Sequence, residues 1–326
     1  MGSTHLKALK NIHAAKLAAV VSSDPVKLNG NLSAIQGNLG GPGERFDFSQ
    51  IKRCTRTEEA LADPGIDAVD LCLPTHLHAP VTIAALRAGK HVLVEKPMAL
   101  NGNEAKQMIE EARKAGRILM TGQVLRFFPM YTSLIDLLGS GDLGPVRAAL
   151  FRRRCAAPSW GKWLLERNEG GGGVFDLLIH DVDMCLRLFG KPASLTATGY
   201  EDLAGGIDIV NAQLQYAEIG SVVVTGGWHH PKSYPFSMEY TVSADGGTIE
   251  YSSAGRPPTL YAKDGSERVL PQPEVDGYQA QLEYFIECAT NGREPELCAT
   301  QESADAVELT RLISDARRMR GAAVAV

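Results

Sequence analysis

The chain has 326 residues, and its 33 basic and 38 acidic side chains give a net charge of −5 at neutral pH. That length suffices for about two domains, and the mild acidity argues against nucleic acid as a partner, which clustered Lys and Arg would favour. Hydrophobic residues make up 44% of the chain, which excludes global disorder. No apolar run reaches the roughly 18 residues that a membrane-spanning helix needs, so no membrane partner is expected.

Six cysteines, none of them in a Cys-x-x-Cys pair, predict reduced and mostly buried thiols. No signal-peptide pattern stands at the recorded start, and together these features favour a cytoplasmic protein. An upstream leader stays open, because the first residues resemble the interior of a domain.

The first part of the chain alternates short apolar runs with amphipathic segments. Leu6, Leu9 and Ile12 recur at helical spacing and predict a helix over 3–13, followed by a Val-rich strand at 17–22. A Gly-, Asn- and Pro-rich stretch at 25–50 predicts loop with at most one short helix. Further helices are predicted at 57–65, 78–89 and 102–115, and strands at 68–74, 91–95 and 118–122. This alternation predicts a doubly wound parallel sheet.

From about residue 145 the pattern changes to strands separated by turns. A strand at 146–154 and a helix from Val174 to Phe189 come first. Strand-like runs follow at 192–199, 208–216, 219–228, 236–243, 247–252 and 258–262, and helices near 277–290 and 302–319. This order predicts an α+β domain built on an antiparallel or mixed sheet.

The chain opens inside a motif. A dinucleotide-binding fold begins with a strand, a G-x-G-x-x-G turn and a helix whose N-terminus faces the pyrophosphate. Here Gly2 stands where the third glycine would be, and a helix follows at once. The first strand is therefore expected to be missing from the recorded chain and to lie upstream of Met1, with the glycine turn, in roughly ten further residues.

Four segments together resemble one family. They are LCLPTHLHAPVTIAALRAGKHVLVEKP at 71–97, GQVLRFFP at 122–129, GDLGPVR at 141–147 and GGGGVFDLLIHDVDMCLRLFG at 170–190. In this order and at these intervals they resemble the glucose–fructose oxidoreductase / inositol dehydrogenase / MocA (Gfo/Idh/MocA) family of NAD(P)-dependent oxidoreductases. The resemblance runs over nearly the whole chain.

The resemblance implies two domains and a reaction. Residues 1–122 would be a Rossmann-type dinucleotide-binding domain, and residues 123–326 an α+β substrate domain with a large open, mostly antiparallel sheet, whose C-terminal helix can pack back on the first domain. The active site would lie between them, and the second sheet would hold a dimer or tetramer together. The implied reaction is oxidation of a secondary alcohol, or reduction of the ketone, on a sugar, cyclitol or related polyol, with NAD or NADP and no metal.

Three residues, Lys96, Asp176 and His180, are expected to carry the chemistry. Lys96 ends a predicted parallel strand, where open α/β sheets bind ligands, and its charge suits an alkoxide-like oxygen; a surface ion pair with Glu95 is the simpler interpretation. Asp176, His180 and Asp183 share one face of a predicted helix. The resemblance implies that His180 takes the hydroxyl proton and Asp176 binds substrate hydroxyls, whereas a structural histidine is the alternative and Asp183 is expected to be structural.

On the cofactor side, Gly2 and the helix after it are expected to receive the pyrophosphate. Ser22 stands about 20 residues on, where an acid usually binds the adenosine ribose. Ser22, Ser23 and Lys27 would suit a 2′-phosphate and Asp24 would oppose it, which leans slightly to NADP. The residues expected at the cofactor are Gly2, Ser3, Thr4, Ser22, Ser23, Asp24, Pro74, Thr75, His78, Glu95, Lys96, Gln123, Arg126 and Trp163.

The residues expected at the substrate are Lys96, Asp176, His180, His229 and Tyr278. Trp163 suits core packing equally well, and His229 suits the surface. The glycines at 170–173 allow either a close backbone approach or a flexible loop. The resemblance also implies a cis bond at Lys96–Pro97.

Two other classes of protein stay open. His76-x-His78 after an apolar strand resembles the metal-binding pair of barrel hydrolases, although the strand–helix alternation of a barrel should not stop near residue 145. The other class is a non-catalytic nucleotide or sugar sensor on the same fold, which would need neither Lys96 nor His180.

Overall fold

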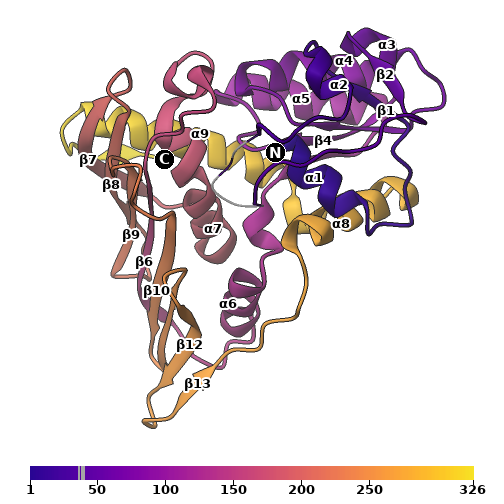
Figure 1. Cartoon of the computed structure of the whole chain (residues 1–326). Helices are drawn as coiled ribbons and strands as arrows, with labels where there is room; N and C mark the ends of the chain where they lie inside the picture. The colour runs from indigo at the N-terminus through magenta and orange to yellow at the C-terminus, as the bar shows by residue number, and fades with distance from the viewer. Residues whose placement is uncertain (36, 38–40) are drawn as a thin grey trace. The chain divides into compact units, whose positions relative to one another are not determined.

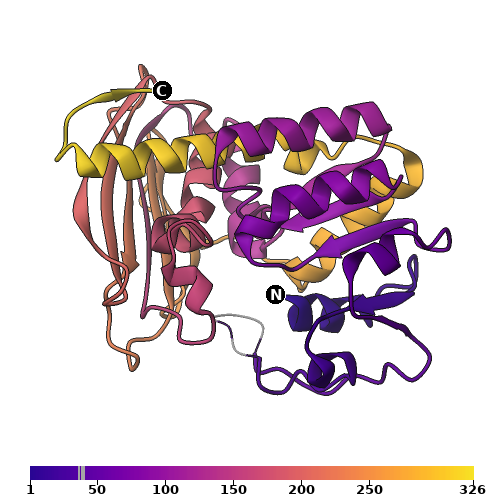
Figure 2. The same cartoon turned by 90° about the horizontal axis from the view of Figure 1, so that it is seen from above.

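The computed structural model describes residues 1–35, 37 and 41–326 (Figures 1 and 2). It contains two compact units, which we describe separately. Unit 1 comprises Met1–Val124 and Asp276–Ala304, and unit 2 comprises Leu125–Val275 and Asp305–Val326. Residues 36 and 38–40, part of the loop predicted at 25–50, lie outside the described residues. None of the described helices has both the length and the apolar composition needed to cross a membrane.

Unit 1 contains two parallel sheets. β1 (Ala19–Val21) pairs with β2 (Lys52–Cys54), and β4 (His91–Glu95) lies between β3 (Ala68–Leu71) and β5 (Leu119–Gly122). The helices are α1 (Gly2–Leu9), α2 (Pro25–Leu28), α3 (Thr57–Leu61), α4 (His78–Arg87), α5 (Gly102–Ala115) and α8 (Gly277–Asn291), with 3-10 turns η1 (Thr75–Leu77) and η5 (Glu296–Cys298). In Figure 1, α4 and α5 lie on one side of β4, and α1 and α8 lie on the other.

The local sequence explains these elements. Val92, Leu93 and Val94 are fully buried, as a central parallel strand requires. Asn101 caps α5 by accepting a hydrogen bond from the Glu104 N–H at 3.0 Å, and Gly116 ends that helix in the left-handed conformation. The predicted parallel, doubly wound class is confirmed.

The two sheets of unit 1 are not joined by a strand among the described residues. In a six-stranded Rossmann sheet the first strand lies between the strands that correspond to β1 and β3. The expectation that further residues supply this strand stays a prediction. The carboxyl ends of β3, β4 and β5 lie at one edge of their sheet because the three strands are parallel.

Unit 2 is built on a nine-stranded sheet with the order β13-β12-β11-β10-β6-β9-β8-β7-β14. The strands are β6 (Val146–Cys155), β7 (Ser194–Asp202), β8 (Ile207–Gln215), β9 (Ser221–Trp228), β10 (Ser237–Ala244), β11 (Gly247–Ser252), β12 (Arg256–Ala262), β13 (Glu267–Val269) and β14 (Val324–Ala325). Every pairing is antiparallel except that of β6 with β9. The predicted large, mostly antiparallel sheet is confirmed.

Helices cover one face of this sheet. α6 (Pro129–Gly139) and α7 (Ile179–Phe189) lie along it in Figures 1 and 2. A further helix, α9 (Thr300–Arg318), belongs to unit 2 from Asp305 onward. Burial alternates along β6, with Phe151 buried on the helix side and Arg152 only half-buried on the other. Tyr131 of α6 packs on Tyr240 and Tyr251 of the sheet at ring-centroid distances of 5.4 and 6.0 Å. The core of unit 2 therefore lies between sheet and helices.

The main differences from the predicted elements have local reasons. The first helix ends at Leu9, and a tighter turn follows in which the Ile12 N–H donates to the Leu9 carbonyl at 3.1 Å. β2 was not predicted because Lys52–Cys54 has no apolar run. α6 was missed because Pro129, its first residue, follows an apolar stretch that resembles a strand. The cysteines form no disulfide among the described residues, and five of the six are buried.

Candidate active site

Lys96 lies directly after β4, in the turn Glu95–Lys96–Pro97. The Lys96–Pro97 peptide bond is cis, as the resemblance implies. From residue 92 to residue 99, Lys96 is the one residue that is not buried. The Lys96 backbone N–H donates to Glu95 Oε2 at 3.2 Å. The turn thus presents one basic side chain from an otherwise buried segment.

His5, in the first turn of α1, joins this turn and was not singled out from the sequence. Its Nε2 lies 3.0 Å from Glu95 Oε1, and its Nδ1 lies 2.8 Å from Asp70 Oδ2 on β3. Burial lowers the pKa of His5, but the charge of Asp70 and the contact with Cys72 raise it well above 6.5. Burial opposes a low pKa for Glu95, but the contact with His5 and the charge of that imidazole lower it. Both shifts favour the charged forms, an imidazolium beside a carboxylate.

His78 contacts the same turn at Pro97, the residue after Lys96. Its Nδ1 lies 2.7 Å from the Pro97 carbonyl and its Nε2 lies 2.9 Å from the Leu73 carbonyl. Burial lowers its pKa. With both ring nitrogens facing carbonyls, His78 offers no metal-ligating atom, and His76 is exposed. Among the described residues, the group compact enough to hold a metal is instead His5, Asp70 and Cys72, where ion pairs already engage both nitrogens of His5.

The residues expected near the pyrophosphate surround the start of α1. Gly2 begins the helix, Ser3 is buried and Thr4 is half-buried. A Cβ on Gly2 would lie 3.7 Å from the Cβ of Cys72, which leaves ordinary van der Waals contact. The Ser3 hydroxyl has no hydrogen-bond partner among the described residues.

Ser22, Ser23 and Asp24 form a turn at the end of β1. The Asp24 N–H donates to Ser22 Oγ at 3.1 Å, and Asp24 caps α2 by accepting from the Val26 N–H at 2.8 Å. Ser23 is exposed, and Lys27 Nζ lies 3.9 Å from Asp24. The carboxylate of Asp24 therefore serves as a helix cap.

The remaining unit 1 candidates follow strands or begin a helix. Pro74 precedes η1, in which Thr75 is 2% exposed, and Gln123 follows β5 and is 1% exposed. Neither amide atom of Gln123 has a hydrogen-bond partner among the described residues. Tyr278 is the second residue of α8, and its ring centroid lies 6.2 Å from that of His5. His5 therefore links Tyr278 to the turn that carries Lys96.

Asp176 and His180 lie together in unit 2. Asp176 belongs to η4 (Val174–Leu178), one turn of π-helix, and His180 stands in the first turn of α7. Every residue from 170 to 186 is buried except these two, which are half-buried. One carboxylate and one imidazole, four positions apart, are thus the accessible groups of an otherwise buried segment. The π-helical turn that carries Asp176 is itself a feature that is frequent at functional sites.

Asp208 on β8 fixes the start of this helix. Its Oδ2 accepts from the Val174 N–H at 3.2 Å, and its Oδ1 pairs with Arg317 of α9. Gly172 has φ +79°, and a Cβ there would lie 2.6 Å from Asp208 Oδ2. A Cβ on Gly173 would lie 3.0 Å from the ring of Trp228. Of the two explanations for the glycine run, the structure shows the close backbone approach.

Three other unit 2 candidates have neighbours of their own. The buried guanidinium of Arg126 pairs with Asp183 of α7. Trp163, in η3 (Lys162–Leu165), packs half-buried on the cluster of Cys155, Leu164, Leu177 and Trp228. His229, directly after β9, is exposed, and its ring centroid lies 3.9 Å from that of His230, with the two rings tilted by 42°.

The side chains of unit 1 fit a dinucleotide cofactor. A helix that begins at a glycine offers backbone N–H groups to phosphate. The buried hydroxyl of Ser3 and the buried amide of Gln123 need polar partners, because unsatisfied buried polar groups are costly. A unit of parallel strands that fits a dinucleotide, together with a second unit built on a large, mostly antiparallel sheet, is the architecture of a class of nicotinamide-dependent oxidoreductases.

Comparison with known proteins identifies the family. Residues 1–123 match the oxidoreductase family model with an NAD-binding Rossmann fold, and residues 131–250 match the GFO/IDH/MocA C-terminal domain. The chain belongs to the Gfo/Idh/MocA family of oxidoreductases. The resemblance seen in the sequence is confirmed, and neither the hydrolase nor the sensor is favoured.

Individual relatives agree with this assignment. The chain is 28% identical to scyllo-inositol 2-dehydrogenase (NAD(+)) of Bacillus subtilis over 90% of its own length and 85% of that protein's. It is 41% identical to 1,5-anhydro-D-fructose reductase of Ensifer adhaerens over 134 residues, which span 40% of each chain. Among solved structures, aldose-aldose oxidoreductase from Caulobacter crescentus matches with a TM-score of 0.79 at 27% identity, covering 99% of this chain and 95% of that one.

Proposed function

We propose that the protein transfers hydride between a nicotinamide dinucleotide and a secondary alcohol or ketone of a sugar, cyclitol or related polyol. The observation that carries this proposal is the accessible pair Asp176 and His180 on a segment that is otherwise buried from 170 to 186. The names of the inositol dehydrogenase and the anhydrofructose reductase support the substrate class. Polar positioning groups also suit a polyhydroxylated substrate, because a deoxy analogue would leave them unpaired.

Each residue has one role in this proposal. His180 takes the proton of the substrate hydroxyl, since an imidazole exchanges protons near neutral pH. Lys96 stabilises the negative charge that develops on the reacting oxygen. Asp176 accepts hydrogen bonds from neighbouring hydroxyls and orients the substrate. The nicotinamide ring, when bound, supplies or accepts the hydride.

The test compares His180→Asn and Lys96→Met with matched controls at exposed positions, His13→Asn and Lys106→Met. Wild-type protein is first assayed on a panel of polyols and keto-sugars with both cofactors. We expect His180→Asn to lower kcat by about 10²–10⁴-fold, the usual contribution of a general base. Binding of the reduced cofactor, followed by its fluorescence, should change little. A near-normal kcat in His180→Asn would remove this residue from the role of base.

For the cofactor we propose a slight preference for NADP over NAD. Support comes from Ser22 at the end of β1, where NAD-specific enzymes usually carry an acid, and from nearby Lys27. Asp24 opposes this preference, although its carboxylate is engaged as the cap of α2. Dissociation constants of NADPH and NADH decide the question, and a tighter NADH complex would contradict the proposal.

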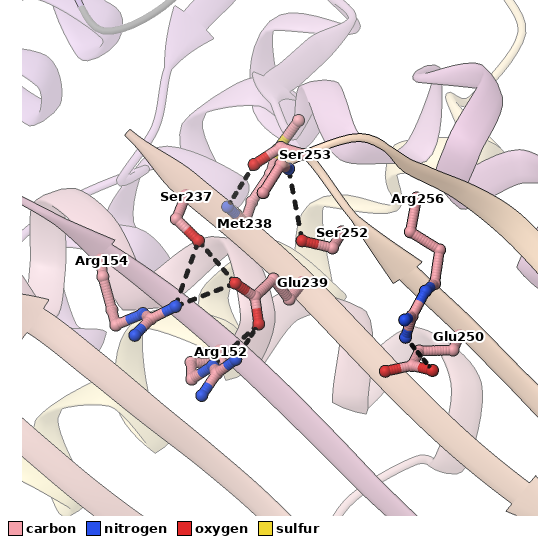
Figure 3. A network of polar contacts seen from close by, with 10 residues as sticks. Arg152, Arg154, Ser237, Met238, Glu239, Glu250, Ser252, Ser253 and Arg256 are labelled. Atoms are coloured by element: carbon pink, nitrogen blue, oxygen red, sulfur yellow. Dashed lines mark hydrogen bonds and ion pairs between the residues drawn. The ribbon is translucent and has the colours of Figure 1, made fainter. Parts of the chain in front are cut away.

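We further propose that the protein forms a homo-oligomer, a dimer or a tetramer, through the sheet face of unit 2 that lies opposite α6 and α7. Figure 3 shows the polar side chains on this sheet. Arg152 and Arg154 of β6 pair with Glu239 of β10, and Arg256 pairs with Glu250. Each of these charged side chains has a partner of opposite sign, so the face can meet a second copy without burying an unpaired charge. Sedimentation equilibrium of wild type and Arg154→Glu tests this, and a monomeric wild type would contradict it.

Within the same proposal, residues 1–122 bind the cofactor and residues 123–326 bind the substrate. The structure adds that α8, with Tyr278, belongs to unit 1. A cytoplasmic location fits cysteines that form no disulfide among the described residues. Mass spectrometry of the alkylated protein from cells tests it, and oxidised cysteines would contradict it.

A further inference from the structure

We propose that His5 is a positioning residue for Lys96: it orients the Glu95 carboxylate, which in turn fixes the Lys96 backbone. The inference rests on the proposed function, in which Lys96 acts on the substrate. It adds a residue on α1 that acts through another residue.

The two oxygens of Glu95 have different partners. Oε1 lies 3.0 Å from His5 Nε2, and Oε2 accepts from the Lys96 N–H at 3.2 Å. One buried carboxylate therefore connects α1 to the first peptide after β4. Without His5, the Glu95 carboxylate would lose its ion pair at Oε1, and Oε2 could turn away from the Lys96 N–H.

The neighbouring strand leaves little room for the carboxylate to turn. A Cβ on Gly122 of β5 would lie 3.0 Å from Glu95 Oε1 and 3.4 Å from Nε2 of the buried Gln281. The absence of a side chain at Gly122 is what admits the carboxylate in its present orientation. Gly122 therefore offers a second, independent way to displace Glu95.

The protonation of His5 follows from its contacts. The groups that face it are Asp70 of β3, Cys72 just after β3, Glu95 of β4 and Tyr278 of α8. Each ring nitrogen lies within 3.0 Å of a carboxylate oxygen, so a neutral imidazole could donate to only one of them. An imidazolium carries a proton toward each carboxylate, and its charge favours the ionised form of Glu95, which accepts from the Lys96 N–H.

The effect on Lys96 is one of preorganisation. His78 holds the Pro97 carbonyl at 2.7 Å, so the backbone is fixed after Lys96 as well as before it. A displacement of a catalytic group by about 1 Å can cost about 10²-fold in rate. We therefore expect loss of His5 to act on kcat more than on cofactor affinity.

Two substitutions separate the contacts of His5. His5→Gln places an amide near the position of Nε2, toward Glu95, whereas His5→Asn places one near Nδ1, toward Asp70. Gly122→Ala displaces Glu95 and leaves His5 in place. His91→Gln is the matched control: His91 lies at the opposite end of β4, where its Nδ1 accepts from the Ile118 N–H at 3.0 Å.

Kinetics supply the first measurement. We expect His5→Asn and Gly122→Ala to lower kcat by about 10²-fold with nearly unchanged cofactor affinity, and His5→Gln to recover part of that loss. His91→Gln should keep the wild-type kcat. Folded His5→Asn with unchanged kcat would overturn the proposal, as would equal losses in all four variants.

Hydrogen exchange and NMR supply measurements that need no substrate. The Lys96 amide should exchange faster in His5→Asn than in wild type, and α5 amides should not change. The ¹⁵N shifts of His5 should show both nitrogens protonated at pH 7. Should wild type oxidise none of the polyols, the proposed function fails, while exchange and NMR still decide whether His5 holds the turn. A neutral His5 or an unchanged Lys96 amide overturns the inference.

Discussion

Arg126 and Asp183 form a buried two-point ion pair in unit 2. Arg126 Nε lies 2.9 Å from Asp183 Oδ2 and Nη2 lies 2.7 Å from Oδ1, and each side chain is 1% exposed. The pair ties the segment after β5 to α7, three residues beyond His180. Because removing two charges from water costs about as much as their attraction returns, the pair fixes the position of α7 more than it stabilises the fold.

Breaking this pair should unfold the protein more easily. Arg126→Met leaves the Asp183 carboxylate buried without its partner, and we expect the free energy of unfolding to fall by about 3–5 kcal/mol. Urea denaturation followed by circular dichroism measures it. Arg147→Met is the control, because Arg147 also meets Asp245 through two bonds of 2.8 Å but in solvent. Equal losses in both variants would show that burial is not what makes the Arg126 pair matter.

Gly172 should tolerate no side chain. In Gly172→Ala the positive φ costs about 1–2 kcal/mol. The added Cβ also clashes with Asp208 and Leu203, which would displace the Asp208 carboxylate from the Val174 N–H. Gly141→Ala is matched, with φ +75° and no atom within 4 Å of the added Cβ. We expect a larger loss of stability at Gly172, together with a fall in kcat that Gly141→Ala lacks. Equal stabilities of Gly172→Ala and Gly141→Ala would mean that the backbone at Gly172 shifts to accommodate the added Cβ, which would contradict the prediction.

The contact between His5 and Glu95 should make stability depend on pH in two directions. The pKa of Glu95 lies below its ordinary 4.5, so its contribution is present above pH 4.5 and is lost as pH falls through the lowered pKa. The pKa of His5 lies above 6.5, so its contribution is fully present below pH 6.5 and is lost as pH rises through the raised pKa. The difference in unfolding free energy between wild type and His5→Asn should therefore be largest between pH 4.5 and pH 6.5.

His91→Gln provides the comparison for that pH series. Burial lowers the pKa of His91 below 6.5, so its neutral form is the one that folding favours. The stability that His91 contributes should be present above pH 6.5 and should be lost as pH falls through its lowered pKa, which is opposite to the trend for His5. Parallel pH curves for the two variants would contradict the assigned charge of His5.

Asp24→Asn should shift cofactor preference toward NADPH. Asparagine caps a helix about as well as aspartate, so α2 keeps its cap while the charge that opposes a 2′-phosphate disappears. We expect the ratio of the NADH to the NADPH dissociation constant to rise with little change in stability. Asp47→Asn, an exposed Asx turn on Ser49, is the control. An unchanged ratio would place the adenosine ribose away from Ser22.

The sequence predicted the features that local patterns encode. The strand at 91–95 and the helix at 102–115 are each encoded by one continuous run of residues. The spacing of Asp176 and His180 placed both on one helix face. The role of His5 could not be predicted, because its partner Asp70 is 65 residues away. The partner of Arg126 is 57 residues away, and nothing in the local sequence distinguishes a buried pair from a group that reaches a ligand. The π-turn at Asp176 left no pattern of its own.

The central place of β6 has a consequence for how the protein is made. β7–β9 and β10–β13 are two runs of consecutive antiparallel strands, and β6 lies between them although it precedes both in the chain. Its Ala148 pairs with Ser221 and its Val146 with Ala244. Closing such long loops is entropically slower than zipping neighbouring strands. During synthesis β6 leaves the ribosome before either of its partner strands, and its first partner, β9, is made more than 60 residues later. The centre of this sheet is therefore completed only by contacts between segments far apart in the chain, whereas its two flanks are built from neighbouring strands.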